Sequence, residues 1–451
     1  MLLGVFIGGF IGGFVGGFIG WFLGGFIGLL LGGFIGLLLG GFIGLLLGWL
    51  TGDDGDGTQP KPPFAPSDPL INKIQTGEFY LRLSFEVVSA VLCQENSVYL
   101  IKWKGDQLHK YKLVDSNNNP IKICNKSIKI QQSMHQIGVT ENFLVLADTS
   151  FTVGIEQIIN NLLVTKPLRQ LFRIIPSQNN SIYIVDRKQL EDLEDVEEYK
   201  EVEAYKVEIP REISHFIVDY YDNNGQKITL HAAHICAWDI AQWLRKGDKL
   251  VPENHEIPDD LLGMQIGEMD ISLMGRHVID VSPEKLNQGK PEITSTNLSC
   301  NTFFTWASGL YTYDDEQFPG HTPPEKLDKI YWSSLGLWEE LTTKFMYDQY
   351  ENYEYRTIEL NKVLELAKKG IPSCLYKLDA ESLTIEDYYK FPRSHIGFSP
   401  QFVPKEGRTG SAPDGGSGSY PDGDSSTDGY IVCVVFTPIE EVDRTSSRTL
   451  F

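Results

Sequence analysis

The sequence predicts a large, mainly-β chain that follows an apolar N-terminal repeat of a different kind. Residues 1–50 contain no charged side chain and have glycine at every fourth position from Gly4 to Gly48. After Gly77, short runs rich in β-branched and aromatic residues alternate with turn-forming Asn, Asp, Gly and Pro. Few segments show the 3.6-residue periodicity of an amphipathic helix. We therefore expect an all-β domain behind an apolar helical repeat.

The repeat in residues 1–50 has two interpretations. Glycine at every fourth position lines one face of a helix and lets two helices approach closely in a membrane. A span needs about 20 apolar residues, so this segment is long enough for a transmembrane hairpin. No basic segment precedes the apolar run, which distinguishes it from a signal peptide. So strict a period also fits a tandem DNA repeat translated ahead of the gene, and the hairpin and the translation artefact both stay open.

A linker separates the repeat from the folded part of the chain. Residues 51–66 contain the acidic run TGDDGDG and the Pro-rich run QPKPPFAP, a composition typical of flexible connections. Residues 67–451 are then the β domain.

Composition excludes some classes of function. The 451-residue chain has a formal charge of -21, which argues against nucleic-acid binding because phosphates would repel it. Its six cysteines include no CxxC pair, so neither a zinc knuckle nor a small disulfide scaffold is indicated. Free thiols in a reducing compartment fit this spacing.

The predicted strands and helices follow from the local patterns. Strand-like runs are residues 79–88, 97–105, 143–151, 181–187, 215–221, 227–234 and 430–436. Helical patterns are residues 189–205, 236–247 and 356–370. Many short strands at this spacing indicate a sandwich, a barrel or a propeller.

Histidine is the residue type through which metal chemistry could enter. None of the nine histidines forms the i, i+4 pair of a zinc-binding helix. His231 and His234 lie three residues apart in a strand-like run, so their side chains should face opposite sides of the sheet. One strand then offers one inward ligand, and a metal site would need ligands from distant segments.

Several segments resemble, in the same order, those of the carotenoid cleavage oxygenase family. They include MHQIGVTENFLVLADTSF (134–151), ITLHAAHICAWDIAQWL (228–244) and FFTWASGLYTYDD (303–315), followed by residues 370–394, 397–407 and 427–436. The resemblance implies a seven-bladed β-propeller, incomplete here, with Fe²⁺ on its axis. Four histidines from four blades hold that iron in the family, and neutral imidazoles leave positions open for O₂.

The resemblance also implies site residues, and the chain departs from the family pattern. His135 stands at one metal-ligand position, and His231 or His234 at the next. Asp68 occupies the place of the family's first ligand, and a carboxylate can also bind iron. A fourth ligand is missing, because no histidine follows His395.

Two further departures concern the support of the site and its blades. Lys390 and Ser399 stand near the positions of glutamates that orient the family's histidines, and neither is an acid. Blades that should precede Asp68 have no counterpart, so the resemblance implies a chain incomplete at both ends.

The expected function is therefore that of an iron-dependent dioxygenase cleaving a C=C bond of a carotenoid or apocarotenoid. Its partners would be a lipophilic polyene, O₂ and a membrane, on the cytoplasmic side or in an organelle, with no nucleic acid. Because ligands are missing, we expect weakened or absent activity. Two alternatives stay open: a metal-free propeller acting as a pseudoenzyme or lipid-binding module, and a membrane-anchored protein whose glycine hairpin is functional.

Overall fold

The computed structural model describes residues 88–94, 97–104, 107–121, 137–148, 179–190, 199–239, 242–251, 255–313, 325–404 and 429–436. All of them belong to one compact unit, Phe79–Phe451. The apolar repeat, the linker and Asp68 lie outside the described residues. Within the described part, no helix is long and apolar enough to cross a membrane.

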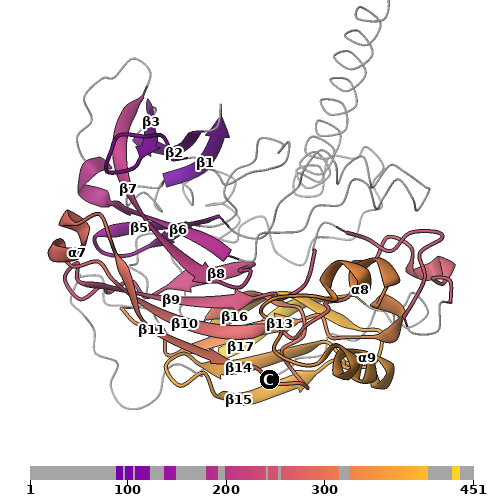
Figure 1. Ribbon diagram of the computed structural model, residues 1–451. Coiled ribbons are helices and arrows are strands. Elements are labelled where there is room, and N and C mark those ends of the chain that lie inside the picture. The colour runs from indigo at the N-terminus through magenta and orange to yellow at the C-terminus, as the bar shows by residue number, and fades with distance from the viewer. Residues whose placement is uncertain are drawn as a thin grey trace, which may run out of the picture. The chain divides into compact units, whose positions relative to one another are not determined.

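Most described elements are strands (Figure 1). The strands are β1 (Val88–Gln94), β2 (Ser97–Lys104), β3 (Gln107–Val114), β4 (Ile137–Val139), β5 (Phe143–Asp148), β6 (Asn179–Asp186), β7 (Lys200–Pro210), β8 (His215–Val218), β9 (Lys227–His234), β10 (Leu273–Asp280), β11 (Glu292–Ser299), β12 (Ser308–Tyr313), β13 (Lys329–Ser334), β14 (Cys374–Asp379), β15 (Ile385–Lys390), β16 (Ile396–Pro404) and β17 (Gly429–Phe436). The α-helices are α7 (Pro283–Asn287), α8 (Lys344–Tyr350) and α9 (Leu360–Lys369). Short 3-10 helices are η2 (Arg187–Leu190), η3 (Asp259–Leu261) and η4 (Glu339–Leu341).

The strands form sheets that follow one another along the chain. The first sheet has the order β1-β2-β3-β7-β6-β5-β4, and next come β11-β10-β9-β8, β12-β13-β14-β15 and β16-β17. The long strand β7 pairs in parallel with β3 through its first residues and antiparallel with β6 through the rest. It therefore joins two four-stranded groups into one seven-stranded sheet.

Successive sheets pack face to face, so the sheets in the middle of the stack are covered on both faces. On β5, Val145 belongs to a cluster shared with β8 and β9, whereas Leu144 belongs to a cluster shared with β2 and β3. On the β8–β11 sheet, Leu230 faces β5 and Ala233 packs with Trp332 of the next sheet. A last cluster, which includes Leu375 and Ile431, joins that sheet to β16–β17. This layered burial is the dominant stabilising feature of the β domain.

Edge strands of neighbouring sheets lie side by side. A Cβ added to Gly138 on β4 would lie 2.9 Å from Val218 Cγ2 on β8, so glycine allows this close approach. The Tyr311 hydroxyl on β12 donates a 3.2 Å hydrogen bond to the Phe216 carbonyl on β8. Strands β12 and β16 are also in contact. The edges β4, β8, β12 and β16 thus form one continuous row.

The mainly-β prediction is confirmed, and several predicted strands coincide with observed ones. β2, β5, β6, β8, β9 and β17 begin and end within a few residues of the predicted runs. The helix predicted at 356–370 is α9, whose Val363, Leu366 and Ala367 are buried on one face. The count of seven blades extends beyond the described residues and stays a prediction.

Two predicted helices are wrong. Residues 200–210 of the acidic segment form strand β7. Its first half buries Val202 and Ala204 toward β2 and β3, and its second half buries Val207 and Ile209 toward β8 and β9. The buried face changes midway, so no simple alternation is visible in the sequence.

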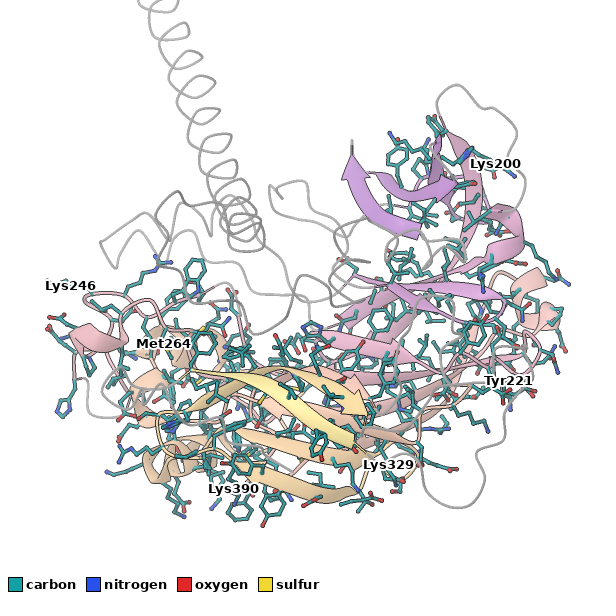
Figure 2. The ribbon with its side chains drawn as sticks, turned by 180° about the vertical axis from the view of Figure 1, so that it is seen from behind. Lys200, Tyr221, Lys246, Met264, Lys329 and Lys390 are labelled. Atoms are coloured by element: carbon teal, nitrogen blue, oxygen red, sulfur yellow. The ribbon has the colours of Figure 1, made fainter. Side chains whose placement is uncertain are left out.

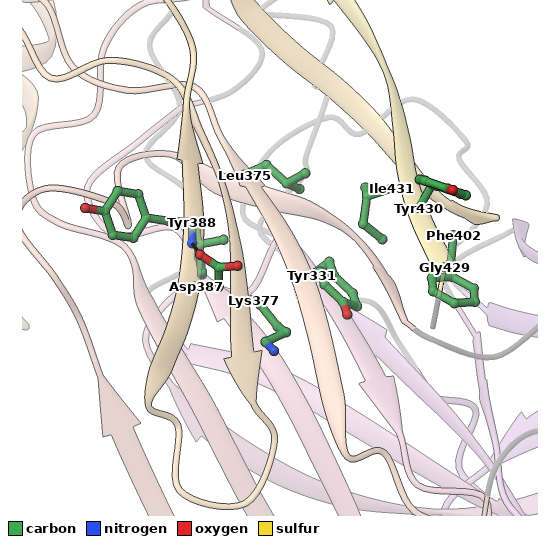
Figure 3. A pocket seen from close by; sticks show the side chains of 10 residues that line it. Tyr331, Leu375, Lys377, Asp387, Tyr388, Phe402, Gly429, Tyr430 and Ile431 are labelled. Atoms are coloured by element: carbon green, nitrogen blue, oxygen red, sulfur yellow. Dashed lines mark hydrogen bonds between the residues drawn. The ribbon is translucent and has the colours of Figure 1, made fainter. Parts of the chain in front are cut away.

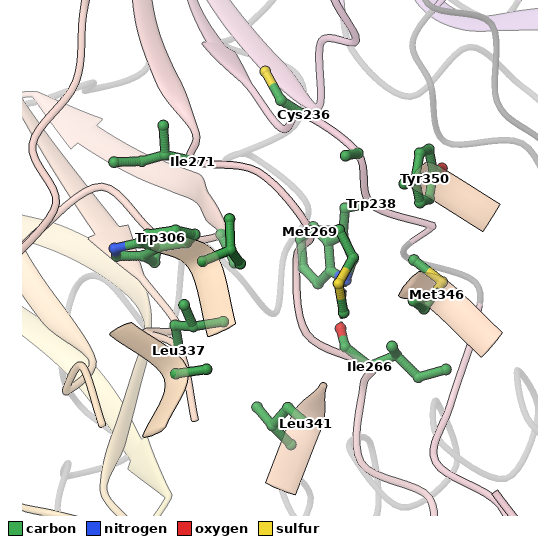
Figure 4. Close-up of a cluster of buried hydrophobic side chains, with 14 of the residues drawn as sticks. Cys236, Trp238, Ile266, Met269, Ile271, Trp306, Leu337, Leu341, Met346 and Tyr350 are labelled. Atoms are coloured by element: carbon green, nitrogen blue, oxygen red, sulfur yellow. Dashed lines mark hydrogen bonds between the residues drawn. The ribbon is translucent and has the colours of Figure 1, made fainter. Parts of the chain in front are cut away.

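In the described part of 236–247, a turn with Ala237 at φ 54° replaces the predicted helix. Cys236, Ala237 and Trp238 are all buried there, in a core that includes Trp306 and Met346 (Figure 4). Apolar residues buried on every side of a turn resemble a helix in sequence, and tertiary packing overrides that pattern.

The Asp222 carboxylate ties the first two sheets together. It is fully buried in the turn between β8 and β9. Its oxygens accept hydrogen bonds from the Thr140 hydroxyl at 2.7 Å and from the Asn142 backbone N–H at 2.8 Å, in the turn between β4 and β5. The Asn142 side-chain amide and the Gly225 N–H also donate to it, at 2.9 and 2.8 Å. One side chain therefore fixes two turns of different sheets.

We predict that Asp222→Ala lowers the free energy of unfolding by about 3 kcal/mol or more, because it leaves several buried donors without an acceptor. The matched control is Asp115→Ala. Asp115 accepts bonds from the Asn117 and Asn119 N–H groups in an exposed turn, and its loss should cost less than about 1 kcal/mol. Urea unfolding measures both, and equal losses would contradict the role given to Asp222.

Candidate metal centre

Strand β8 presents His215 at the boundary between sheets. His215 is the first residue of β8, an edge strand, and its side chain is half-buried. A Cβ added to Gly309 on β12 would lie 3.5 Å from His215 Cδ2 and 3.4 Å from Ser214 Oγ. This imidazole therefore lies beside the edge strand of the next sheet.

His231 is engaged inside the β8–β11 sheet. Its Nε2 lies 3.1 Å from Asp219 Oδ1, and both side chains are buried. Asp219 Oδ1 also accepts a 3.1 Å hydrogen bond from the Leu327 backbone N–H. Asp219 thus holds the imidazole and a neighbouring segment together, which makes His231 a structural link.

His234 forms a second buried link, on the other face. Its Nε2 lies 3.0 Å from Nε2 of His277 on β10, and His277 Nδ1 lies 3.1 Å from the Thr296 hydroxyl on β11. The two rings meet above Gly275, where an added Cβ would lie 2.6 Å from His234 Nε2. Glycine at this position therefore makes room for the pair.

Burial keeps both imidazoles of this pair neutral near pH 7. It lowers the pKa of His277 to about 4, and it lowers the pKa of His234 well below its usual range. A neutral imidazole donates from one nitrogen and accepts at the other, so one of the two facing nitrogens carries the proton.

Two buried acids, Glu212 and Glu268, lie close to the His234 end of β9. The Glu212 carboxylate accepts a hydrogen bond from the Tyr353 hydroxyl, and burial raises the pKa of Glu212 to about 7. Glu268 accepts from the Ser272 hydroxyl at 2.6 Å and from the Ala307 N–H, and burial raises its pKa well above the usual range. These acids brace loops against the helical core, and each has named partners.

The structure describes two of the four predicted ligand residues. His135 and Asp68 lie outside the described residues. His231 and His234 face opposite sides of β9, as their spacing predicts, because β9 is a regular strand in this region. Their assignment as alternative ligands stays a prediction.

The positions expected to hold glutamates serve other purposes. Lys390 is labelled in Figure 2. Its ammonium lies 5.0 Å from the Phe304 ring centre and 5.4 Å from that of Tyr388, a cation–π arrangement. Ser399 has φ 48° where the β16–β17 pairing is irregular. Neither position supplies a carboxylate to a histidine.

Residues 90–450 match the family described as Retinal pigment epithelial membrane protein. The match extends over most of the chain. The chain belongs to this family. It is the carotenoid oxygenase group that the sequence motifs indicate.

The chain resembles individual proteins less clearly than it matches the family. A search of curated proteins found no match. Among solved structures, a lignostilbene dioxygenase from Pseudomonas brassicacearum is similar, with 13% sequence identity and a TM-score of 0.36. The similarity covers 75% of this chain and 52% of that one. The chain thus spans about half the length of that enzyme.

The described residues include imidazoles, the kind of ligand that the family's iron uses, but too few of them lie together to hold it. Imidazole nitrogen is a usual iron ligand, and two imidazoles on adjacent coordination positions at about 2.1 Å lie about 3 Å apart. The His234–His277 pair has this separation, but both rings are enclosed in the sheet. Within the described part of the chain, no three His, Cys, Asp or Glu side chains gather around one point.

His215 and His277 are the histidines whose positions sequence reasoning missed. His215 starts a run that the sequence does predict as a strand, but the place of that strand at a sheet edge depends on the order of strands in space. His277 lies in the segment LMGRHVID of β10. Buried and partly buried residues alternate there from Gly275 to Asp280, but Val278 and Ile279 are adjacent apolar residues, so the sequence itself shows no such alternation.

We predict that the His277 pKa contributes to acid unfolding. A histidine whose folded-state pKa lies below its unfolded value stabilises the fold above about pH 6.5, and that contribution is lost as the pH falls toward 4. His277→Gln cannot take up this proton, so its stability should fall less between pH 6.5 and 4, by up to about 3 kcal/mol. Thermal unfolding at several pH values measures this. Parallel curves for variant and wild type would contradict it, and His395→Gln, at a partly exposed histidine, is the control.

Proposed function

We propose that this chain is an iron-dependent dioxygenase that cleaves a C=C bond of a carotenoid or apocarotenoid, and that its sheets are part of a seven-bladed propeller. Family membership across residues 90–450 is the observation that carries the proposal. Face-to-face packing of successive sheets and the row of edge strands support the propeller.

We propose His135 and His215 as two of the iron ligands. His135 precedes β4 by two residues, and β4 lies beside β8, which His215 opens. Ligands taken one per sheet should come from edge strands that adjoin one another. His231 and His234 lie on the second strand and are enclosed, which leaves less room for O₂ and substrate. They and Asp68 are the alternatives that the test below includes.

Bound iron would supply the binding and activation of O₂. The overall reaction adds both oxygen atoms across the cleaved bond: one C=C and the O–O bond break, two C=O bonds form, and no further reductant is needed. The chain's own contribution would be to orient neutral imidazoles. Gly309 lies beside His215, and an added Cβ there would be in ordinary van der Waals contact with the imidazole.

Two other functions would follow from specific outcomes. A chain that binds a polyene without holding iron would be a lipid-binding module. A chain that partitions into membranes only while it carries residues 1–50 would be anchored by its glycine repeat. Membrane association itself rests on that segment.

We predict that the anaerobically loaded chain holds less than one Fe²⁺ per molecule, because fewer than four histidine ligands are identified. His135→Ala and His215→Ala should each weaken iron binding at least about tenfold, since even residues that only orient ligands have effects of this size. His395→Ala, at a partly exposed histidine outside the β8–β11 sheet, is the matched control. Iron content and O₂ uptake with an apocarotenal are the two readouts.

The same series tests the alternatives. If His231→Ala, His234→Ala or Asp68→Ala lowers iron content while His215→Ala does not, the proposed ligand pair is wrong. If no variant changes either readout, the dioxygenase proposal itself fails for this chain.

A further inference from the structure

We propose that the space between the β12–β15 and β16–β17 sheets binds a small neutral phenol. A cavity of about 130 Å³ lies there, lined by residues of five strands, β13 to β17 (Figure 3). It is built from other strands than those that carry His215, His231, His234 and His277. The proposal is therefore independent of iron and of the dioxygenase activity.

The cavity has an apolar floor and aromatic walls. Leu375 and Ile431 are buried and belong to the core between the two sheets. Tyr331, Phe402 and Tyr430 are only partly covered and line the same space. Aromatic side chains around an aliphatic floor favour a flat, apolar ring.

The volume selects a single ring. A dry cavity of about 150 Å³ holds one benzene molecule, so about 130 Å³ takes one six-membered ring with a small substituent. A polyene would extend far beyond this space. The ligand class is thus distinct from the substrate proposed above.

Three polar side chains lie along one side of the cavity. Tyr331, Lys377 and Asp387 are register partners on adjacent strands, so they share one face of the sheet. Lys377 offers an ammonium donor and Asp387 a carboxylate acceptor. A hydroxyl on the ring can pair with either one.

The local charge favours a neutral ligand over an anion. The Lys377 ammonium lies 3.3 Å from a Glu386 carboxylate oxygen, and Glu386 also contacts Lys329 at 2.7 Å. Asp379 contacts the same Lys329 at 2.8 Å. Asp387 and Asp328, whose carboxylate lies 3.9 Å from Lys329, bring the carboxylates to four, against three ammonium groups when Lys390 beside the Tyr388 ring is counted. This balance disfavours benzoate relative to phenol.

Gly429 sets the position of the Phe402 wall. A Cβ at residue 429 would lie 2.4 Å from Phe402 Cζ, too close for two carbon atoms. Its φ lies outside the left-handed region that glycine favours. Because that Cβ would also lie 2.8 Å from the Val403 carbonyl oxygen, Gly429→Ala should move the Phe402 ring together with the adjacent β16 backbone, and with them this wall of the cavity.

Saturation-transfer NMR on the full chain, without iron, tests the proposal with phenol, benzoate and cyclohexanol as probes. We expect saturable phenol binding with a dissociation constant on the order of 0.1–1 mM, as suits so small a ligand. Benzoate and cyclohexanol should bind more weakly. Lys377→Met and Gly429→Ala should each weaken phenol binding by about fivefold, the effect of one hydrogen bond or a displaced wall. Lys362→Met, on the exposed face of α9, should have no effect.

Each possible result supports or overturns the proposed site. Non-saturable phenol binding, or equal binding by the wild type, Lys377→Met and Gly429→Ala, would overturn the site. Tighter binding of benzoate would overturn the neutral ligand class. If Gly429→Ala fails to fold, Lys377→Met alone tests the site, because the Lys377 side chain is partly exposed and is not part of the buried core.

Discussion

The buried Asp222 carboxylate is the interaction on which the placement of the candidate metal centre depends. It joins the β4–β5 turn to the β8–β9 turn through three hydrogen bonds and accepts a fourth from Gly225 within its own turn, and a buried carboxylate with these partners holds them firmly. The turns fix where β4 and β8 lie, and Gly138 then allows the two edge strands to touch. His215 occupies its position as a consequence.

Sheet burial on both faces divides the histidines into two groups. His231, His234 and His277 lie within the β8–β11 sheet, where each ring has a protein partner, and burial lowers the pKa of His234 and His277. These rings strengthen the contacts between strands. His215 lies on an edge strand and keeps partial exposure. Exposure at a boundary between sheets, and not the number of histidines on a strand, is what a site for metal, O₂ and substrate requires.

Much of the fold was predictable from sequence, and less of the site. Short runs of residues with high β propensity, bounded by turn formers, predicted β9 and β17 closely, and the helical pattern of residues 356–370 predicted α9. The strand β7 was hidden because its two halves bury opposite faces. Strand spacing predicted that His231 and His234 diverge. It could not identify Asp219 or His277 as their partners, because those contacts depend on the order of strands in space. His215 was missed for the same reason.

The central claim is that the metal ligands come from adjoining edge strands, with His215 among them. Iron K-edge X-ray absorption on the Fe²⁺-loaded chain counts the imidazoles bound to iron and tests this claim most directly. The count should fall by one in His215→Ala and stay unchanged in His234→Ala. An unchanged count in His215→Ala, together with a lower count in His234→Ala, would show that the iron site lies within the β8–β11 sheet and would contradict the account.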